Sequence, residues 1–157
     1  MFIATHSEHI LSNILNRDDC LVIKIKNNSY DKYYNGSNGR ILPSITISEI
    51  KYLIFDLYTT DFHNLLYSYI QENCVSDLNG NLLINATIKQ TDDWLKGQGV
   101  LLKSYYKQIS PGNIKQYDTL PTYIRNCIDH PDDSIIYSNK ELEESINKMI
   151  EIIKKIA

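Results

Sequence analysis

The sequence predicts an α/β fold in which a short strand–helix stub with a β-hairpin is followed by a mainly helical region. Two observations lead to this class. Apolar and β-branched runs of strand length occur within the first 43 residues. From residue 44 onward, apolar residues recur mainly at helical spacing, and two of the expected helices begin with a Thr/Ser-x-x-Glu capping pattern. We therefore expect two regions, over residues 1–43 and 44–157.

The composition is globular and excludes several classes of protein. The 157 residues can bury a core, and no apolar run approaches the ~18 residues needed to cross a bilayer. The net charge of −3 argues against a broad basic surface for duplex DNA, although it leaves room for a local anion site. Three widely spaced cysteines, Cys20, Cys74 and Cys127, form neither a disulfide framework nor a zinc pattern, so we expect a reduced, cytoplasmic protein without a membrane partner.

The N-terminal segment predicts a strand, a tight polar turn and a helix. An apolar run at Phe2–Ala4 leads into Thr5, His6 and Ser7, and helical spacing of apolar residues follows over residues 8–15. The Ser7 hydroxyl can cap that helix. The segment resembles the last strand and helix of an α/β unit whose earlier strands are not part of this sequence.

A β-hairpin is expected next. Cys20–Lys26 is β-branched and partly alternating, which indicates a strand, and Tyr30–Tyr34 is its expected partner. The cluster Gly36–Gly39 predicts a turn.

Helices dominate the rest of the chain. A capping box is predicted at Thr46–Glu49, before an apolar stripe over residues 47–57, and a second stripe covers residues 62–70. Further helices are predicted over 84–96, over 120–130 with Pro121 in the first turn, and from Lys140 to near the end behind a second capping box at Ser138–Glu141, while 100–109 is ambiguous.

Residues 3–11, Ile-Ala-Thr-His-Ser-Glu-His-Ile-Leu, resemble the switch-histidine segment, or H-loop, of ABC-type ATPases. The match is closest to the AAA/OLD-like group found in bacterial anti-phage defence and abortive infection. The resemblance implies that His6 contacts the γ-phosphate of ATP, while Thr5 and Ser7 shape the turn. An imidazole held there can polarise the attacking water.

Two other interpretations of this segment are weaker. Thr5-His6-Ser7 could form only the polar start of a helix, which is the simpler interpretation of three residues taken alone. A zinc pair from His6 and His9 lacks further ligands nearby in sequence, so we predict no metal site.

The sequence lacks the other ATPase motifs. Gly97–Ser104 has no glycine directly before Lys103, so it cannot form a Walker A phosphate loop. Tyr52–Asp56 is followed by Leu57 where a Walker B motif has Glu, and its spacing is helical. We therefore expect an incomplete ATPase, whose His6 completes an ATP site held by the remaining ATPase core or by a homologous chain.

Downstream segments extend the resemblance over most of the chain. Four segments resemble, and follow in the same order as, parts of the C-terminal region of a subset of these ATPases. They are residues 48–55, 61–67, 123–126 and His130-Pro131. Family members often carry His-His-Pro at the last site. Here Asp129 replaces the first His, so any role for that residue does not carry over.

Arg125, Asn126 and His130 also fit the Arg-polar-x3-His signature of HEPN-type ribonucleases. That resemblance implies metal-independent RNA cleavage, usually across a homodimer, in which the His assists proton transfer and the Arg steadies a phosphate. Positions 125 and 130 lie about 140° apart on an ideal helix, so they converge only if the helix loosens before Pro131. The structural alternative is a helix end with a solvated Arg125 and a capping His130, and the acidic neighbours of His130 repel phosphate.

A third hypothesis is a non-enzymatic helical interaction module. The apolar stripe of the terminal helix must be covered by the core or by a dimer partner. His63 is expected to be a packed or capping histidine rather than a catalyst, and the twelve tyrosines are expected at core edges rather than as base-stacking platforms.

Overall fold

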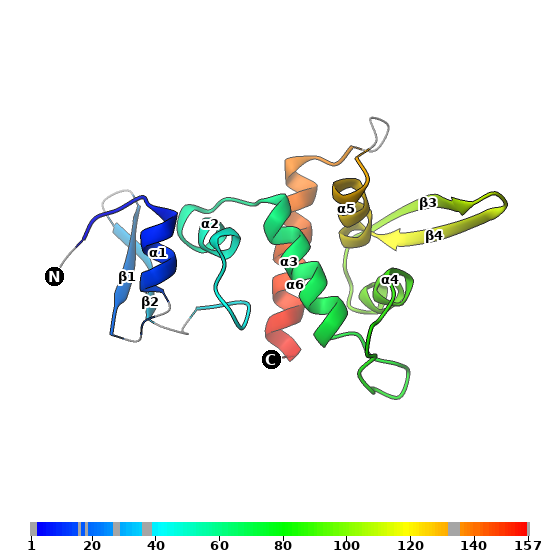
Figure 1. The fold of residues 1–157 in the computed structure, drawn as a ribbon, viewed down its shortest axis with the longest axis horizontal. Coiled ribbons are helices and arrows are strands. Elements are labelled where there is room, and N and C mark those ends of the chain that lie inside the picture. The colour runs from blue at the N-terminus through cyan, green and yellow to red at the C-terminus, as the bar shows by residue number, and fades with distance from the viewer. Residues whose placement is uncertain are drawn as a thin grey trace. The chain divides into compact units, whose positions relative to one another are not determined.

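A computed structural model describes residues 3–15, 17, 19–26, 29–35, 39–131 and 136–156 (Figure 1). Helices and antiparallel strands are both present, and helices predominate in the C-terminal part, which confirms the predicted α/β class. The chain divides into two compact units, Met1–Thr59 (unit 1) and Thr60–Ala157 (unit 2). Unit 1 includes the helix that follows residue 43, which the sequence analysis assigned to the C-terminal region.

Unit 1 combines a β-hairpin with two helices. Its elements are α1 (Glu8–Ile14), β1 (Leu21–Lys26), β2 (Ser29–Asn35) and α2 (Ile47–Phe55). The two strands pair antiparallel, which confirms the predicted hairpin, and α1 contacts both α2 and β1. The predicted turn at Gly36–Gly39 lies mostly outside the described residues.

The strand predicted before Thr5 is not formed. Ile3–Ser7 has no strand structure and leads directly into α1, and Phe2 lies outside the described residues. A strand needs a neighbour that satisfies its backbone N–H and C=O groups. Among the described residues of unit 1, β1 and β2 pair with each other, and Ile3–Ser7 pairs with neither. The strand prediction is therefore wrong for Ile3–Ser7.

The two faces of β1 are unusual in polarity. Val22 and Lys24 are buried, and the Lys24 ammonium is paired with Asp56, whose Oδ2 lies 2.5 Å from Nζ. The alternate positions are exposed aliphatic residues, with exposed fractions of 58% for Leu21, 49% for Ile23 and 76% for Ile25. In a sheet that is covered on one face only, the buried positions are normally apolar and the exposed positions polar.

Glu49 is a buried carboxyl that joins α2 to the segment before it. Thr46 Oγ1 caps α2 by accepting a hydrogen bond from Glu49 N at 3.1 Å. The reciprocal half of the predicted capping box is absent, because Glu49 Oε1 instead accepts from Ile41 N at 2.6 Å and from Leu42 N at 3.4 Å. Oε2 has no hydrogen-bond partner, and burial raises the pKa of Glu49.

Unit 1 should therefore lose stability as the pH rises above the ordinary range of a glutamate. A folded-state pKa above the unfolded value means that the folded protein binds more protons, so this contribution is present at low pH and is lost as the pH passes the folded pKa. We expect Glu49→Gln to gain stability relative to wild type as the pH rises from about 4 to about 8. Unfolding followed by circular dichroism measures this difference.

Glu8→Gln is the matched control, because Glu8 is part-exposed and lies 3.6 Å from Lys51. Its stability relative to wild type should show no gain with rising pH. A pH-independent difference between Glu49→Gln and wild type would show that Glu49 does not carry this effect.

Unit 2 is a helical core with a projecting hairpin. Its elements are α3 (Thr60–Asn73), α4 (Ile88–Gly97), β3 (Leu102–Ser110), β4 (Asn113–Thr119), α5 (Leu120–Asp129) and α6 (Asn139–Ile156). In the described chain, α6 packs against α3 and α5, and β3 and β4 form an antiparallel pair. The segment 100–109, ambiguous in sequence, thus contributes a strand.

The apolar stripe of α6 lies in the core. Its buried members are Leu142, Ile146, Met149, Ile150, Ile152 and Ile153. The predicted capping box before it is formed: Glu141 N donates to Ser138 Oγ at 3.2 Å, and Ser138 N donates to Glu141 Oε2 at 2.8 Å. Because α3 and α5 cover this stripe, it does not remain as an open contact surface.

Helix α4 begins later than predicted. It starts at Ile88 instead of Ile84, because Thr87 and Gln90 form a reciprocal capping box with bonds of 3.3 Å and 2.8 Å. Asn85 precedes it with a φ of 59°, which is incompatible with a continuous helix.

His63 is packed in the core, as predicted. It is fully buried on α3, and its Nε2 lies 3.0 Å from Ser145 Oγ on α6. Burial lowers the pKa of His63 to about 3, so the imidazole is neutral at physiological pH.

All three cysteines are free thiols, with Cys74 and Cys127 buried and Cys20 partly exposed. Among the described residues, no helix combines the length and the apolar character that crossing a membrane requires.

Candidate functional site

The Thr5–Ser7 segment forms a compact turn at the start of α1. Ser7 N donates a hydrogen bond to Thr5 Oγ1 at 2.9 Å, and Ser7 Oγ accepts a long one from Ile10 N at 3.5 Å. Both hydroxyl side chains are thus used to shape the turn and the helix start. His6, between them, is exposed. The only side chain of the three that reaches solvent without a role in the turn is this imidazole.

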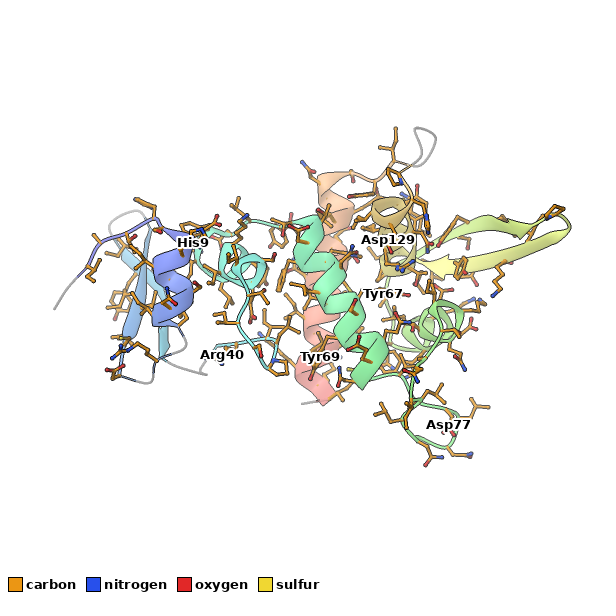
Figure 2. All side chains as sticks on the ribbon, in the orientation of Figure 1. His9, Arg40, Tyr67, Tyr69, Asp77 and Asp129 are labelled. Carbon is orange, nitrogen blue, oxygen red and sulfur yellow. The ribbon has the colours of Figure 1, made fainter. Side chains whose placement is uncertain are left out.

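His9 lies on the first turns of α1 and is exposed (Figure 2). Its backbone carbonyl accepts hydrogen bonds from Ser12 Oγ at 2.9 Å and from Asn13 Nδ2 at 3.1 Å. No cluster of three metal-ligating side chains occurs in the part of the chain that the structure describes, and the His6–His9 pair belongs to none.

The three residues of the ribonuclease signature have different environments on α5. Arg125 is paired with Asp129, with 2.7 Å between Nη2 and Oδ2, and Asp129 stands at the end of the helix (Figure 2). Asn126 is 5% exposed, and its Nδ2 donates to Thr122 O at 2.9 Å and to Tyr105 Oη. His130 is exposed.

Helix α5 ends just before Pro131, which is the condition that the sequence set for Arg125 and His130 to converge. His130 is the C-cap, with a φ of −134° and a ψ of 72°, and its N–H bonds to Asn126 O at 3.0 Å. Pro131 disfavours the helical conformation for the residue before it, which explains this ending. The geometry nevertheless buries the Asn126 amide against β3, while His130 faces solvent. The structure does not bring Asn126 and His130 together at an exposed surface.

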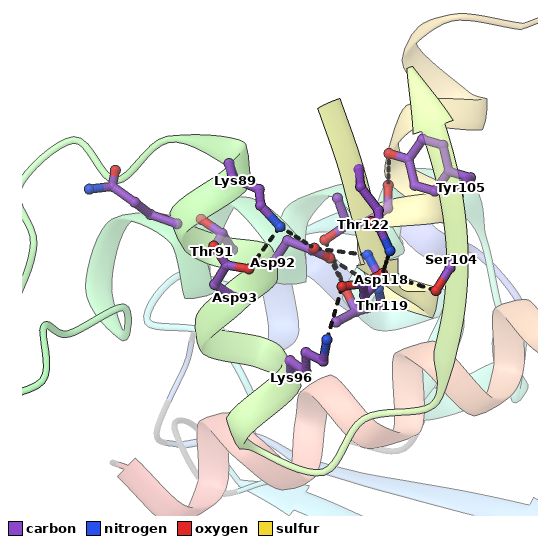
Figure 3. A network of polar contacts seen from close by, with 12 residues as sticks. Lys89, Thr91, Asp92, Asp93, Lys96, Ser104, Tyr105, Asp118, Thr119 and Thr122 are labelled. Carbon is purple, nitrogen blue, oxygen red and sulfur yellow. Dashed lines mark hydrogen bonds and ion pairs between the residues drawn. The ribbon is translucent and has the colours of Figure 1, made fainter. Parts of the chain in front are cut away.

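A different set of residues forms the most extensive polar cluster described in unit 2 (Figure 3). The Asp92 carboxylate, on α4, is fully buried and accepts hydrogen bonds from Thr119 Oγ1 at 2.6 Å, Thr119 N at 3.1 Å and Asp118 N at 2.9 Å. Lys89 Nζ lies 3.7 Å from it. A carboxylate at a helix N-terminus satisfies free N–H groups and favours the helix dipole. Asp92 therefore caps α5 from outside that helix.

The cluster extends from this cap to buried hydroxyl groups on one side and to exposed side chains around Asp118 on the other. Thr122 Oγ1 lies 3.0 Å from Thr119 Oγ1 and 3.2 Å from Tyr67 Oη. Asp118 accepts from Lys96 Nζ and from Ser104 Oγ, both at 2.9 Å. These bonds hold the pKa of Asp118 at about 2, and burial raises the pKa of Tyr67. Since its polar groups are directed at one another, the cluster is built for structure rather than for catalysis.

No family motif in the sequence marks Asp92. One signal was present, because Ile88, Asp92 and Leu95 share the inner face of α4 at helical spacing. An acid on an otherwise apolar stripe predicts a buried hydrogen-bonded carboxylate. Sequence analysis did not use this signal.

The Asp77 loop, which carries several polar side chains, is also internally satisfied (Figure 2). Asp77 Oδ1 accepts from Asn79 N at 2.8 Å and from Asn81 N at 2.9 Å, while Oδ2 accepts from Asn81 Nδ2 at 3.1 Å. These bonds lower the pKa of Asp77 and define a closed turn, not a cation site.

Comparison with known proteins gives no relative for this chain: no family model, no curated protein and no solved structure matches it.

Asp92→Asn should destabilise unit 2 by about 1–3 kcal/mol, because one acceptor oxygen is replaced by an amide that faces buried N–H groups. Asp93→Asn is the matched control, since its side chain is 58% exposed, and it should change stability by less than about 0.5 kcal/mol. Urea unfolding followed by the fluorescence of Trp94, the single tryptophan, measures both. Equal effects of the two substitutions would show that Asp92 is not the cap.

Asn126→Ala and His130→Ala separate a structural from a catalytic role. The first should cost about 1–3 kcal/mol of stability, because Tyr105 loses a buried partner, and the second should cost less than about 0.5 kcal/mol. Urea unfolding gives the stability of each. Incubation with tRNA in EDTA gives the second readout. RNA cleavage that His130→Ala abolishes without unfolding the protein would contradict a structural role for this motif.

Proposed function

We propose that this chain supplies the switch histidine of an ABC-like ATPase, in which His6 contacts the γ-phosphate of ATP held by an ATPase core. The observation that carries the proposal is the geometry of the turn before α1. Ser7 bonds to Thr5 and to Ile10, and the His6 side chain between Thr5 and Ser7 is exposed. An exposed histidine beside such a turn can donate a hydrogen bond to a phosphate oxygen and orient a water molecule.

The outer face of β1 supports a missing partner layer. Leu21, Ile23 and Ile25 are exposed on one side of the strand, while Val22 and Lys24 are covered on the other. A row of exposed aliphatic side chains on one face of a strand is typically covered by another layer of structure or by a partner. The partner we propose is therefore the ATPase core, encoded in frame or as a homologous chain.

The sequence itself explains why such a core is needed. Binding of ATP phosphates by this class of protein uses a Gly-rich loop of backbone amides followed by Lys, and the sequence has no such loop. The isolated chain is expected neither to bind ATP tightly nor to hydrolyse it. The resemblance to AAA/OLD-like proteins extends the proposal to a cytoplasmic role in anti-phage defence.

The alternative of a HEPN-like ribonuclease receives less support. Its polar residue, Asn126, is buried between Thr122 and Tyr105, and Arg125 is paired with Asp129. The hypothesis of a non-enzymatic interaction module also receives less support. It was based on the apolar stripe of α6, and that stripe is covered within unit 2.

The test compares His6, which precedes α1, with His9, which lies on α1, in the assembled ATPase. His6→Ala should lower ATP hydrolysis by about 100-fold, because the γ-phosphate loses its imidazole contact. His9→Ala, an exposed histidine on the adjoining helix turn, should leave hydrolysis unchanged. Release of inorganic phosphate measures both.

Two outcomes would refute this proposal. One is hydrolysis by the isolated chain at a rate comparable to that of complete ATPases. The other is full activity of His6→Ala in an assembly that contains a phosphate loop.

A further inference from the structure

We propose that Asn79 is a site of spontaneous deamidation, and that the turn closed by Asp77 keeps this reaction slow in the folded protein. Asn79 is followed by Gly80, in the loop that joins α3 to α4. The site lies in unit 2 and takes no part in the role proposed for His6. It is therefore tested without an ATPase core.

The chemistry of the site is that of an asparagine followed by glycine. The Gly80 backbone nitrogen loses its proton and attacks the Asn79 side-chain carbon Cγ. A bond forms between these two atoms, the bond from Cγ to the side-chain nitrogen breaks, and that nitrogen takes up a proton and leaves as ammonia. Water then opens the resulting succinimide ring at either carbonyl carbon, which gives aspartate or isoaspartate. The net reaction consumes one water molecule and releases one ammonia molecule.

The fold requires the glycine that makes this pair reactive. Asp77 N donates to Asn81 O at 2.9 Å, and Ser76 and Leu82 pair antiparallel beyond them. Three residues thus form the hairpin loop, and a loop of this length commonly ends on a glycine in the left-handed conformation. Gly80 has a φ of 83°, which a residue with a side chain rarely adopts. Any other residue at position 80 would be strained, although the space around its Cβ is open.

The two asparagines of the loop differ in their surroundings. Asn79 is exposed, and its side-chain amide takes part in none of the hydrogen bonds that close the turn. The Asn81 amide, by contrast, donates from Nδ2 to Asp77 Oδ2 at 3.1 Å. Asn81 also precedes Leu82, whose side chain hinders attack by the backbone nitrogen. Of these two, Asn79 is therefore the reactive one.

The attacking nitrogen is held by the closed turn. Gly80 N donates its hydrogen to Asp77 O at 3.0 Å, so the proton that must be lost is engaged in a hydrogen bond. The Asp77 carboxylate fixes the flanking amides, because Oδ1 accepts from Asn79 N at 2.8 Å and from Asn81 N at 2.9 Å. Attack on Asn79 therefore requires the turn to open transiently. The rate of deamidation then follows the population of the open turn.

Deamidation would open the turn permanently. Isoaspartate adds one carbon atom to the main chain before Gly80, which displaces Gly80 N from Asp77 O. Either product also adds a negative charge near the Asp77 carboxylate, and like charges repel at short distance. Ser76, the preceding residue, accepts a hydrogen bond from Trp94 Nε1 of α4 at 3.2 Å. The modification is thus a one-way change that loosens the connection between α3 and α4.

The first experiment incubates the full chain at mildly alkaline pH and follows the mass gain at Asn79 by peptide mapping and mass spectrometry. Asp77→Ala should deamidate about tenfold faster than wild type, because two backbone N–H groups lose their acceptor and the turn opens more often. Asp77→Asn removes the charge but keeps an acceptor oxygen, so its rate should stay within about twofold of wild type. Asp93→Ala, which changes an exposed carboxylate on α4, is the matched control and should deamidate like wild type.

The second experiment needs no change at Asp77 and compares the wild-type chain in buffer and in urea. Unfolding should accelerate the mass gain at Asn79 by at least about tenfold, since the closed turn is lost. Aged wild-type protein should also show altered Trp94 fluorescence, whereas Asn79→Ser, which has no side-chain amide, should not. The other Asn–Gly pairs of the sequence, Asn35–Gly36 and Asn38–Gly39, lie far from Asn79 in sequence and are mapped separately.

Three results would overturn the proposal. The first is the absence of a mass gain at Asn79 even in urea. The second is equal deamidation in the folded and the unfolded chain, which would show that the turn gives no protection. The third is equal acceleration by Asp77→Ala and Asp77→Asn, with circular dichroism confirming that both variants are folded, because the acceptor oxygen would then have no effect.

Discussion

The buried Asp92 carboxylate is the interaction on which the architecture of unit 2 depends. Helix α5 begins directly after β4, without a side-chain cap from its own N-cap residue. Asp92 supplies that cap from α4 and fixes three elements at one point, since it accepts from both Asp118 and Thr119. The start of α5 then places Asn126 against Tyr105, and this contact supports the base of the projecting hairpin. The Asp92 carboxylate thus joins α4 to the junction between β4 and the helix that carries the ribonuclease-like signature.

Unit 1, by contrast, combines buried charged groups with an exposed apolar face. It buries groups that are normally exposed, the Lys24 ammonium with Asp56 and the Glu49 carboxyl with one unpartnered oxygen, while three aliphatic side chains of β1 face solvent. Buried charges are tolerated when they are paired, or when the group gives up its charge. The exposed aliphatic face has no such compensation within the described residues of the unit. A covering ATPase core, as proposed for this chain, would bury this face.

The sequence predicted those elements whose signals are local. The hairpin of β1 and β2, the packing of His63 and the capping box at Ser138 follow from alternation, periodicity and spacing, and the structure confirms them. The missed features depend on contacts between distant segments. Glu49 matched a capping box, but Ile41 and Leu42 offered competing N–H groups, and no pattern reveals that Tyr105 meets Asn126. At the candidate site, local sequence predicted Ser7 as the cap of α1, and the ATPase resemblance implied that Thr5 and Ser7 shape the turn. The phosphate contact of His6 involves atoms outside this chain and stays a prediction.

The central claim concerns the distance between one imidazole and one phosphate. The most direct measurement is a structure of the assembled ATPase with a non-hydrolysable ATP analogue bound. The account predicts that a ring nitrogen of His6 lies within hydrogen-bond distance of a γ-phosphate oxygen, about 3 Å, and that the Leu21, Ile23 and Ile25 side chains are covered by the core. A nucleotide bound elsewhere, with His6 still open to solvent, would contradict it.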